Sequence, residues 1–155
     1  MSGSGAPVVE PVDAAGLTLG IVATTWHGEI TDQLLARAVE AAKACLVADI
    51  VVARVAGSVE LPVVAQALAN RCDAVVALGV VIRGATAHFD YVCRSVTDGL
   101  TRVALDTGRP VAHGVLTVDS VEQAWDRAGL PDSSEDKGWS STVAALDAAL
   151  AIRAI

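Results

Sequence analysis

The most distinctive stretch of this sequence contains a histidine, whose imidazole side chain can ionise. An apolar run ends in the turn Arg-Gly-Ala-Thr at residues 83–86, and a helical pattern begins with His88 in its first turn. His88 can exchange protons near neutral pH, Gly84 lets a ligand approach the backbone, and Thr86 either caps the helix or offers its hydroxyl. Since helix N-termini attract anions, the stretch predicts a site for a phosphate-bearing ligand. Alternatively, His88 is a surface or capping residue.

The elements that must position His88 alternate regularly along the chain. Four times, a short apolar run typical of a buried strand is followed by a helical pattern, and a last helix begins near residue 137. The predicted strands are residues 17–25, 49–55, 74–81 and 111–117. The first four predicted helices are residues 29–46, 59–68, 88–107 and 120–129. This alternation predicts a three-layer α-β-α fold of the α/β class, with a doubly wound, four-stranded parallel sheet.

Composition limits the classes of protein and partner. The 155 residues indicate one domain, residues 15–155, after a flexible tail, residues 1–14, part of which could join a sheet edge. A net charge of −7 without any Lys/Arg run argues against a nucleic-acid partner. No apolar run approaches the roughly 20 residues of a membrane span, and no signal peptide is recognisable, so we expect no membrane partner and a cytoplasmic location.

Further polar and aromatic candidates lie in the loops that follow the other strands. Trp26 either stacks on a planar ligand or fixes the first helix to the sheet. Glu60 either contacts a ligand or compensates a helix dipole. Arg127 and Lys137 either join the site or form a solvated charged face. The spacing of histidines and cysteines predicts no metal site, and the three cysteines are expected to be reduced thiols.

Several motifs occur in order between residues 15 and 150. They are Gly-Ser-Val-Glu-Leu-Pro at 57–62, the whole stretch 77–92, Gly-Val-Leu-Thr at 114–117, Glu-Gln-Ala at 122–124 with Arg-Ala-Gly at 127–129, and Lys-Gly at 137–138. Together they resemble the 6,7-dimethyl-8-ribityllumazine synthases. The resemblance implies a flavodoxin-like fold and condensation of 5-amino-6-ribitylaminouracil with 3,4-dihydroxy-2-butanone 4-phosphate, which releases phosphate and water in riboflavin biosynthesis. It implies neither a metal nor a cofactor.

The same resemblance implies roles for individual residues. His88 would be the general acid/base, with Arg127 and Lys137 completing the catalytic set from a neighbouring subunit. The phosphate would lie on residues 84–86. The contacts to the pyrimidine, its ribityl chain and the phosphate would be made by Trp26, Ser58, Val59, Glu60, Val80, Val81, Ile82, Gly84, Ala85, Thr86 and His113. Ala85 stands where relatives often have glycine or glutamine, and His113 where phenylalanine or asparagine is frequent.

A site shared between subunits implies a homo-oligomer, and the family is built on pentamers. The long loop 129–138 contains proline and resembles members that remain single pentamers. A second hypothesis is a scaffold of this family with reduced or no activity, natural or engineered, that assembles with another protein through apolar surface at Leu46, Val47, Trp125 and Trp139. A third hypothesis is a flavodoxin-like electron-transfer module.

Overall fold

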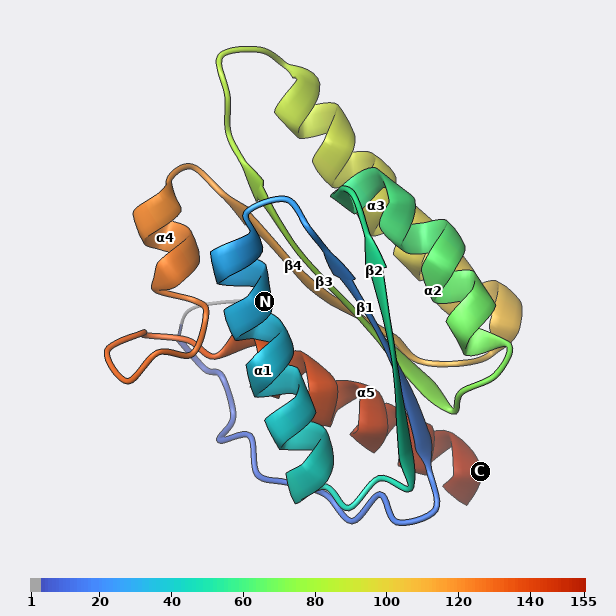
Figure 1. The fold of residues 1–155 in the computed structure, drawn as a ribbon. Coiled ribbons are helices and arrows are strands. Elements are labelled where there is room, and N and C mark those ends of the chain that lie inside the picture. Colours follow the sequence, from blue (N-terminus) through green and yellow to red (C-terminus); the bar gives the residue numbers. More distant parts are fainter. Residues whose placement is uncertain (1–3) are drawn as a thin grey trace.

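A parallel sheet forms the centre of the computed structural model, which describes residues 4–155 (Figure 1). Its strands are β1 (Thr18–Thr24), β2 (Asp49–Val55), β3 (Ala74–Ile82) and β4 (Val111–Val118), in the order β2-β1-β3-β4. The central strands β1 and β3 are buried along almost their whole length, which explains their continuous apolar sequences. The predicted doubly wound, four-stranded sheet is therefore confirmed.

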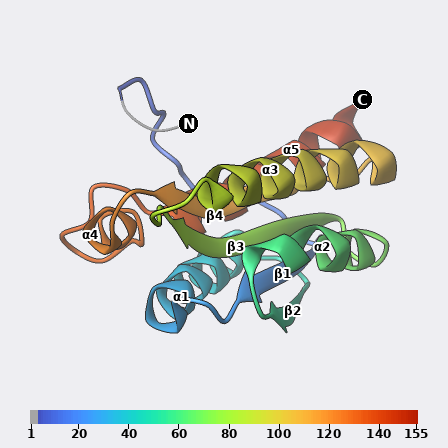
Figure 2. The same ribbon diagram turned by 90° about the horizontal axis from the view of Figure 1, so that it is seen from above.

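Helices cover both faces of the sheet. Helices α1 (Gly28–Ala44) and α5 (Lys137–Ala154) enclose one buried cluster, while α2 (Leu61–Ala69) and α3 (His88–Thr107) enclose the other. Figure 2 shows β3 between α1 and α3. A short turn, η1 (Ser58–Glu60), precedes α2, and Pro62 lies in the first turn of that helix, where its missing N–H is tolerated. The three-layer architecture is confirmed.

The segment after β4 differs from its prediction. Helix α4 spans only Val121–Trp125, capped by the Ser120 hydroxyl, which accepts a hydrogen bond from the Gln123 N–H at 3.2 Å. The predicted continuation to residue 129 is wrong, because the chain turns back after α4 through Gly129, whose φ is 79°. The returning chain donates from the Lys137 N–H to the Arg127 carbonyl at 3.0 Å. Two cationic residues ten positions apart are thus neighbours.

The amino-terminal segment is attached to the rest of the chain by hydrogen bonds and by apolar contacts of Val9, Val12 and Ala14 with the core. Trp139 Nε1 donates to the Val9 carbonyl at 3.2 Å, and the Ala14 N–H donates to the Cys45 carbonyl at 2.8 Å. Residues 4–14 contain neither a helix nor a strand. Residues 1–3 lie outside the described part of the chain, and the flexibility predicted for residues 1–14 stays a prediction.

Candidate functional site

A cavity of about 370 Å³ opens at the edge of the sheet where the strands end. Its walls come from the loops after β1, β2 and β3, from the last residues of β3 and from the first turns of α3. The lining residues are Trp26, His27, Gly57, Ser58, Val59, Glu60, Val80, Val81, Ile82, Gly84, Thr86, His88, Phe89 and Val92. We call this the first cavity. Its position is the usual one for a ligand in an open parallel sheet.

Trp26 and Glu60 form one part of the first cavity. The backbone of Trp26 is held on both sides, since its N–H donates to Ala56 at 3.1 Å and its carbonyl accepts from the Thr31 hydroxyl at 2.9 Å. The ring is nevertheless 65% exposed, too open for a contact that fixes α1 to the sheet. Glu60 Oε2 accepts from the Gly57 N–H at 2.9 Å. This part of the cavity therefore presents an accessible indole, on a backbone held by two hydrogen bonds, beside a carboxylate.

The turn between β3 and α3 forms another part. Within residues 4–155, no group accepts a hydrogen bond from the N–H of Gly84, Ala85 or Thr86, and all three residues are exposed. Thr86 does not act as a strong cap, because its hydroxyl lies 3.4 Å from the His88 nitrogen. Exposed backbone donors at the start of a 20-residue helix suit an anion. His88, also exposed, stands directly beside them.

A second cavity, of about 410 Å³, lies along the edge strand β4. It is lined by Thr97, Thr101, His113, Val115, Leu116, Thr117, Val118, Arg127, Glu135 and Lys137. Arg127 donates from NH1 to the Gln123 carbonyl at 2.9 Å and lies 4.0 Å from carboxylate oxygens of Asp126 and Glu135. This second cavity has cationic groups where the first has apolar walls and backbone donors.

His113 projects from β4 into the second cavity. Its Nε2 lies 3.0 Å from the Thr97 hydroxyl on α3. Burial lowers the pKa of His113, and the nearby Lys137 ammonium lowers it further. The imidazole is therefore neutral at pH 7, and one ring nitrogen can accept a hydrogen bond while the other donates.

Helix α3 separates the two cavities. His88 lines the first cavity and Thr97 the second, and the same holds for Val92 and Thr101. The members of each pair are nine residues apart. At about 100° per residue, such positions point to opposite sides of a helix. One chain thus presents two cavities on opposite flanks of α3, with no lining residue in common.

Comparison with known proteins identifies the family. The sequence profile of the 6,7-dimethyl-8-ribityllumazine synthases matches residues 16–153. The chain belongs to the 6,7-dimethyl-8-ribityllumazine synthase family. The family resemblance predicted from the sequence motifs is confirmed.

Individual members of the lumazine synthase family match over nearly the whole chain. The protein named 6,7-dimethyl-8-ribityllumazine synthase in Salinispora arenicola is 74% identical over 155 residues, covering all of this chain and 93% of its own length. Its counterpart in Thermobifida fusca is 64% identical over 153 residues, 99% of this chain and 89% of that protein. The Mycobacterium avium protein of the same name is 59% identical over 150 residues, which cover 97% of this chain and 94% of that protein.

The residues predicted from the lumazine synthase motifs separate between the two cavities. The first cavity contains all but one of those predicted from the loops after β1, β2 and β3, and the second contains His113, Arg127 and Lys137. The exception is Ala85, which is exposed but lines neither cavity. The roles of these residues stay predictions, but their division between two cavities fits the expectation of a site shared between subunits.

Several lining residues were not predicted from the sequence. Val92 could have been recognised, because a position four residues after His88 lies on the same face of a helix. Phe89 follows His88 directly, and helical periodicity does not place it on that face. The same periodicity could have placed Thr97 and Thr101 together on the opposite flank of α3. Glu135 had no such signal, since it reaches the second cavity only because the loop after α4 turns back.

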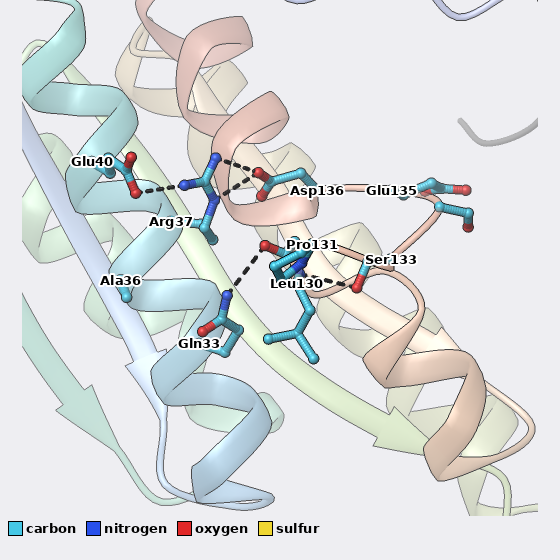
Figure 3. A pocket seen from close by; sticks show the side chains of 11 residues that line it. Gln33, Ala36, Arg37, Glu40, Leu130, Pro131, Ser133, Glu135 and Asp136 are labelled. Atoms are coloured by element: carbon cyan, nitrogen blue, oxygen red, sulfur yellow. Dashed lines mark hydrogen bonds and ion pairs between the residues drawn. The ribbon is translucent and has the colours of Figure 1, made fainter.

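A third cavity, of about 610 Å³, contains none of the predicted site residues (Figure 3). It lies between α1 and the loop after α4. Arg37 donates to Asp136 at 2.7 Å and also pairs with Glu40, while Gln33 donates to the Gly129 carbonyl at 3.3 Å. These contacts connect α1 with the loop after α4, which indicates a structural junction between the two.

The four apolar residues predicted to form an exposed surface differ in their exposure. Val47, Trp125 and Trp139 pack in part against the core, and the Arg37 guanidinium lies 5.1 Å from the centre of the Trp139 ring. Leu46, 63% exposed, is the most accessible of the four apolar residues. A second protein partner stays a prediction.

The described residues show neither a cluster of metal-binding side chains nor a helix that could span a membrane. Within the described residues, 4–155, no group of three or more His, Cys, Asp or Glu side chains is arranged to hold a metal ion. None of the helices in that range is long and apolar enough to cross a membrane. The three cysteines are free: Cys45 and Cys72 are buried, and Cys93 is half-buried.

Proposed function

We propose that this chain catalyses the condensation of 5-amino-6-ribitylaminouracil with 3,4-dihydroxy-2-butanone 4-phosphate. The products are 6,7-dimethyl-8-ribityllumazine, phosphate and water, in riboflavin biosynthesis. Family membership over residues 16–153 and 74% identity to a protein named for this activity support the assignment.

The observation that supports a shared site is the position of the two cavities on opposite flanks of α3. A ligand in the first cavity of one chain can meet Arg127, Lys137 and His113 only if another copy supplies them. A ring of subunits, each placing its second cavity against the first cavity of its neighbour, satisfies this requirement throughout. We propose a homopentamer that does not assemble further, in keeping with the long loop 129–138.

The phosphate of the four-carbon substrate would bind at the turn between β3 and α3. The N–H groups of Gly84, Ala85 and Thr86 donate to it, and the positive end of the α3 dipole favours its charge. Arg127 of the adjacent subunit adds a charge-assisted contact. Ala85 contributes only its backbone here, which agrees with a methyl side chain outside the cavity.

His88 would transfer protons between the two substrates. Formation of an imine, loss of phosphate and ring closure each move a proton, and an imidazole can both donate and accept a proton in such steps. His88 lies beside the phosphate-binding turn, so it can protonate the departing phosphate oxygen and remove a proton from the carbon chain. Lys137 would balance the negative charge that develops at the phosphate.

The pyrimidine would occupy the other part of the first cavity. The exposed Trp26 ring stacks on its face. Its edges and ribityl hydroxyls contact the polar groups of Ser58 and Glu60, the backbone of Val59, and the β3 backbone at Val80, Val81 and Ile82. His113 of the neighbouring subunit adds a neutral hydrogen-bonding group.

The reaction is tested by incubating the protein with both substrates and recording lumazine absorbance together with released phosphate. We expect lumazine and phosphate to appear at equal rates, and no lumazine with either substrate alone. Release of phosphate without lumazine, or no turnover, would contradict the assignment. Light scattering on the same sample measures the oligomer, and a monomer with full activity would contradict the shared site.

A further inference from the structure

The turn that offers backbone donors to phosphate has little internal support. It begins where the Arg83 N–H donates to the Val118 carbonyl at 2.9 Å, at the end of the sheet. Beyond that point the N–H groups of residues 84–86 have no acceptor within residues 4–155. Figure 1 shows this turn arching past the end of β3. Some other contact must maintain its shape, because an unsupported turn would lose its order and bind anions weakly.

The side chain of Arg83 supplies such a contact. Its guanidinium carbon lies 4.3 Å from the centre of the Phe89 ring, and its NH1 lies 3.4 Å from Asp90 Oδ1. Arg83 precedes the turn, whereas Phe89 and Asp90 follow it in the first turn of α3. One side chain therefore connects the two ends of the turn.

The same guanidinium reaches the segment that leads to the second cavity. Its Nε donates to Asp119 Oδ1 at 2.8 Å, just beyond β4. The Asp119 N–H donates to Gln123 Oε1 at 2.8 Å, and the Gln123 carbonyl accepts from Arg127 NH1 at 2.9 Å. A continuous series of contacts thus runs from the turn between β3 and α3 to Arg127.

Arg83 itself lines neither cavity. Exposed ion pairs contribute little to stability, and Arg83, Asp90 and Asp119 are each about half or more exposed. The contacts of Arg83 therefore affect geometry more than folding. A planar, forked guanidinium can stack on Phe89 while donating to two carboxylates, which an ammonium cannot do.

We propose that Arg83 is a positioning residue of the phosphate site, which holds the 84–87 turn in its anion-binding shape through Phe89, Asp90 and Asp119. This inference rests on the proposed function, because it assumes that the turn binds the phosphate of the substrate. Asp119 is the partner through which Arg83 also orients the segment before Arg127.

The test compares Arg83→Lys and Arg83→Met with the parent. Binding of inorganic phosphate is measured by calorimetry, and the Michaelis constants of both substrates by lumazine absorbance. We expect both variants to weaken phosphate binding and to raise KM for the butanone phosphate by about tenfold or more, the scale of a misplaced binding group. KM for the pyrimidine substrate and the thermal midpoint should stay close to the parent values. The matched control is Arg102→Lys, which alters an exposed ion pair between Arg102 and Asp106 within α3. This variant should behave like the parent.

Asp119→Asn probes the partner. If Arg83 acts through Asp119, the double variant Arg83→Met with Asp119→Asn should be no worse than Arg83→Met alone. Additive losses would overturn this route. Parent-like phosphate binding by Arg83→Lys would overturn the geometric role, and an equal rise in both Michaelis constants with a lower thermal midpoint would reduce Arg83 to a structural residue.

The outcomes separate this inference from the reaction itself. A parent that turns over both substrates, while Arg83→Lys keeps its KM for the butanone phosphate, overturns the inference alone. A parent without turnover overturns the proposed reaction. In that case, binding of inorganic phosphate still tests the positioning role. Weaker phosphate binding by Arg83→Lys supports this role, and parent-like phosphate binding overturns it.

Discussion

The first cavity and the second cavity are built in different ways. The first is formed where consecutive strands end, so its walls are the backbone, apolar side chains and the start of a helix. The second is formed by an edge strand and a loop that returns to it, and it contains two cations, a carboxylate and a neutral imidazole. The first cavity has apolar walls and backbone donors that could position a ligand, whereas the second contains the charged side chains. Each lacks what the other provides, and α3 keeps them apart within one chain.

The largest expected effect concerns the proton-transfer residue of the first cavity. His88→Ala should lower kcat by roughly 10²-fold or more, the usual contribution of general acid/base catalysis. The oligomer should remain intact, because His88 is exposed and its side chain is not part of the buried core. Steady-state kinetics and light scattering measure both quantities. An unchanged kcat would remove His88 from its role.

The next effect concerns the charge supplied by the second cavity. Arg127→Met should raise KM for the butanone phosphate by about 10- to 100-fold, since a hydrogen bond to a charged group contributes about 1.5–3 kcal/mol. KM for the pyrimidine should change little. Arg71→Met, an exposed residue near the opposite end of the sheet, is the control. Equal effects on the two substrates would show that Arg127 is not specific for phosphate.

A smaller effect should distinguish the two ends of the first cavity. Trp26→Ala should raise KM for the pyrimidine substrate by about tenfold, because stacking of a base on an aromatic ring contributes roughly 1–3 kcal/mol. Trp26→Phe should retain most of the affinity. KM for the butanone phosphate should not change in either variant. If it rose as much as KM for the pyrimidine, Trp26 would shape the whole cavity and not one end.

The smallest effect is a pH dependence of stability from the second cavity. Because burial lowers the pKa of His113, the folded protein binds fewer protons than the unfolded chain below about pH 6.5. The free energy of unfolding should therefore fall as the pH decreases from 7 toward 5. Denaturant titration of the parent and of His113→Gln measures it, and the variant should lose less stability over that interval. Identical losses would show that His113 titrates alike in both states.

Local patterns account for what the sequence could predict. The strand, turn and helix around His88 are contiguous, so the first cavity could be assembled from residues 79–92 and from the loops at the same sheet edge. Local patterns could not decide whether Trp26 stacks on a ligand or fixes α1 to the sheet, because the exposure of Trp26 is visible only in the folded chain. Helical and strand periodicity also could not predict that Arg127 and Lys137 are neighbours. Their proximity depends on a backbone hydrogen bond that forms when the loop after α4 turns back. The family resemblance supplied that relation instead.

The central claim, a site shared between copies of this chain, is tested most directly by mixing two impaired variants and assaying them at a butanone phosphate concentration well below the parent KM, where both are slow. His88→Ala damages the first cavity and Arg127→Met the second, so a mixed ring contains some interfaces where an intact first cavity meets an intact second cavity. We expect subunits co-refolded from the two variants to regain a substantial fraction of parent activity, about one quarter for random mixing in equal amounts. Separately refolded variants combined afterwards should stay impaired if subunits do not exchange. Co-refolded mixtures of verified mixed composition that remain as slow as either variant would contradict the shared site.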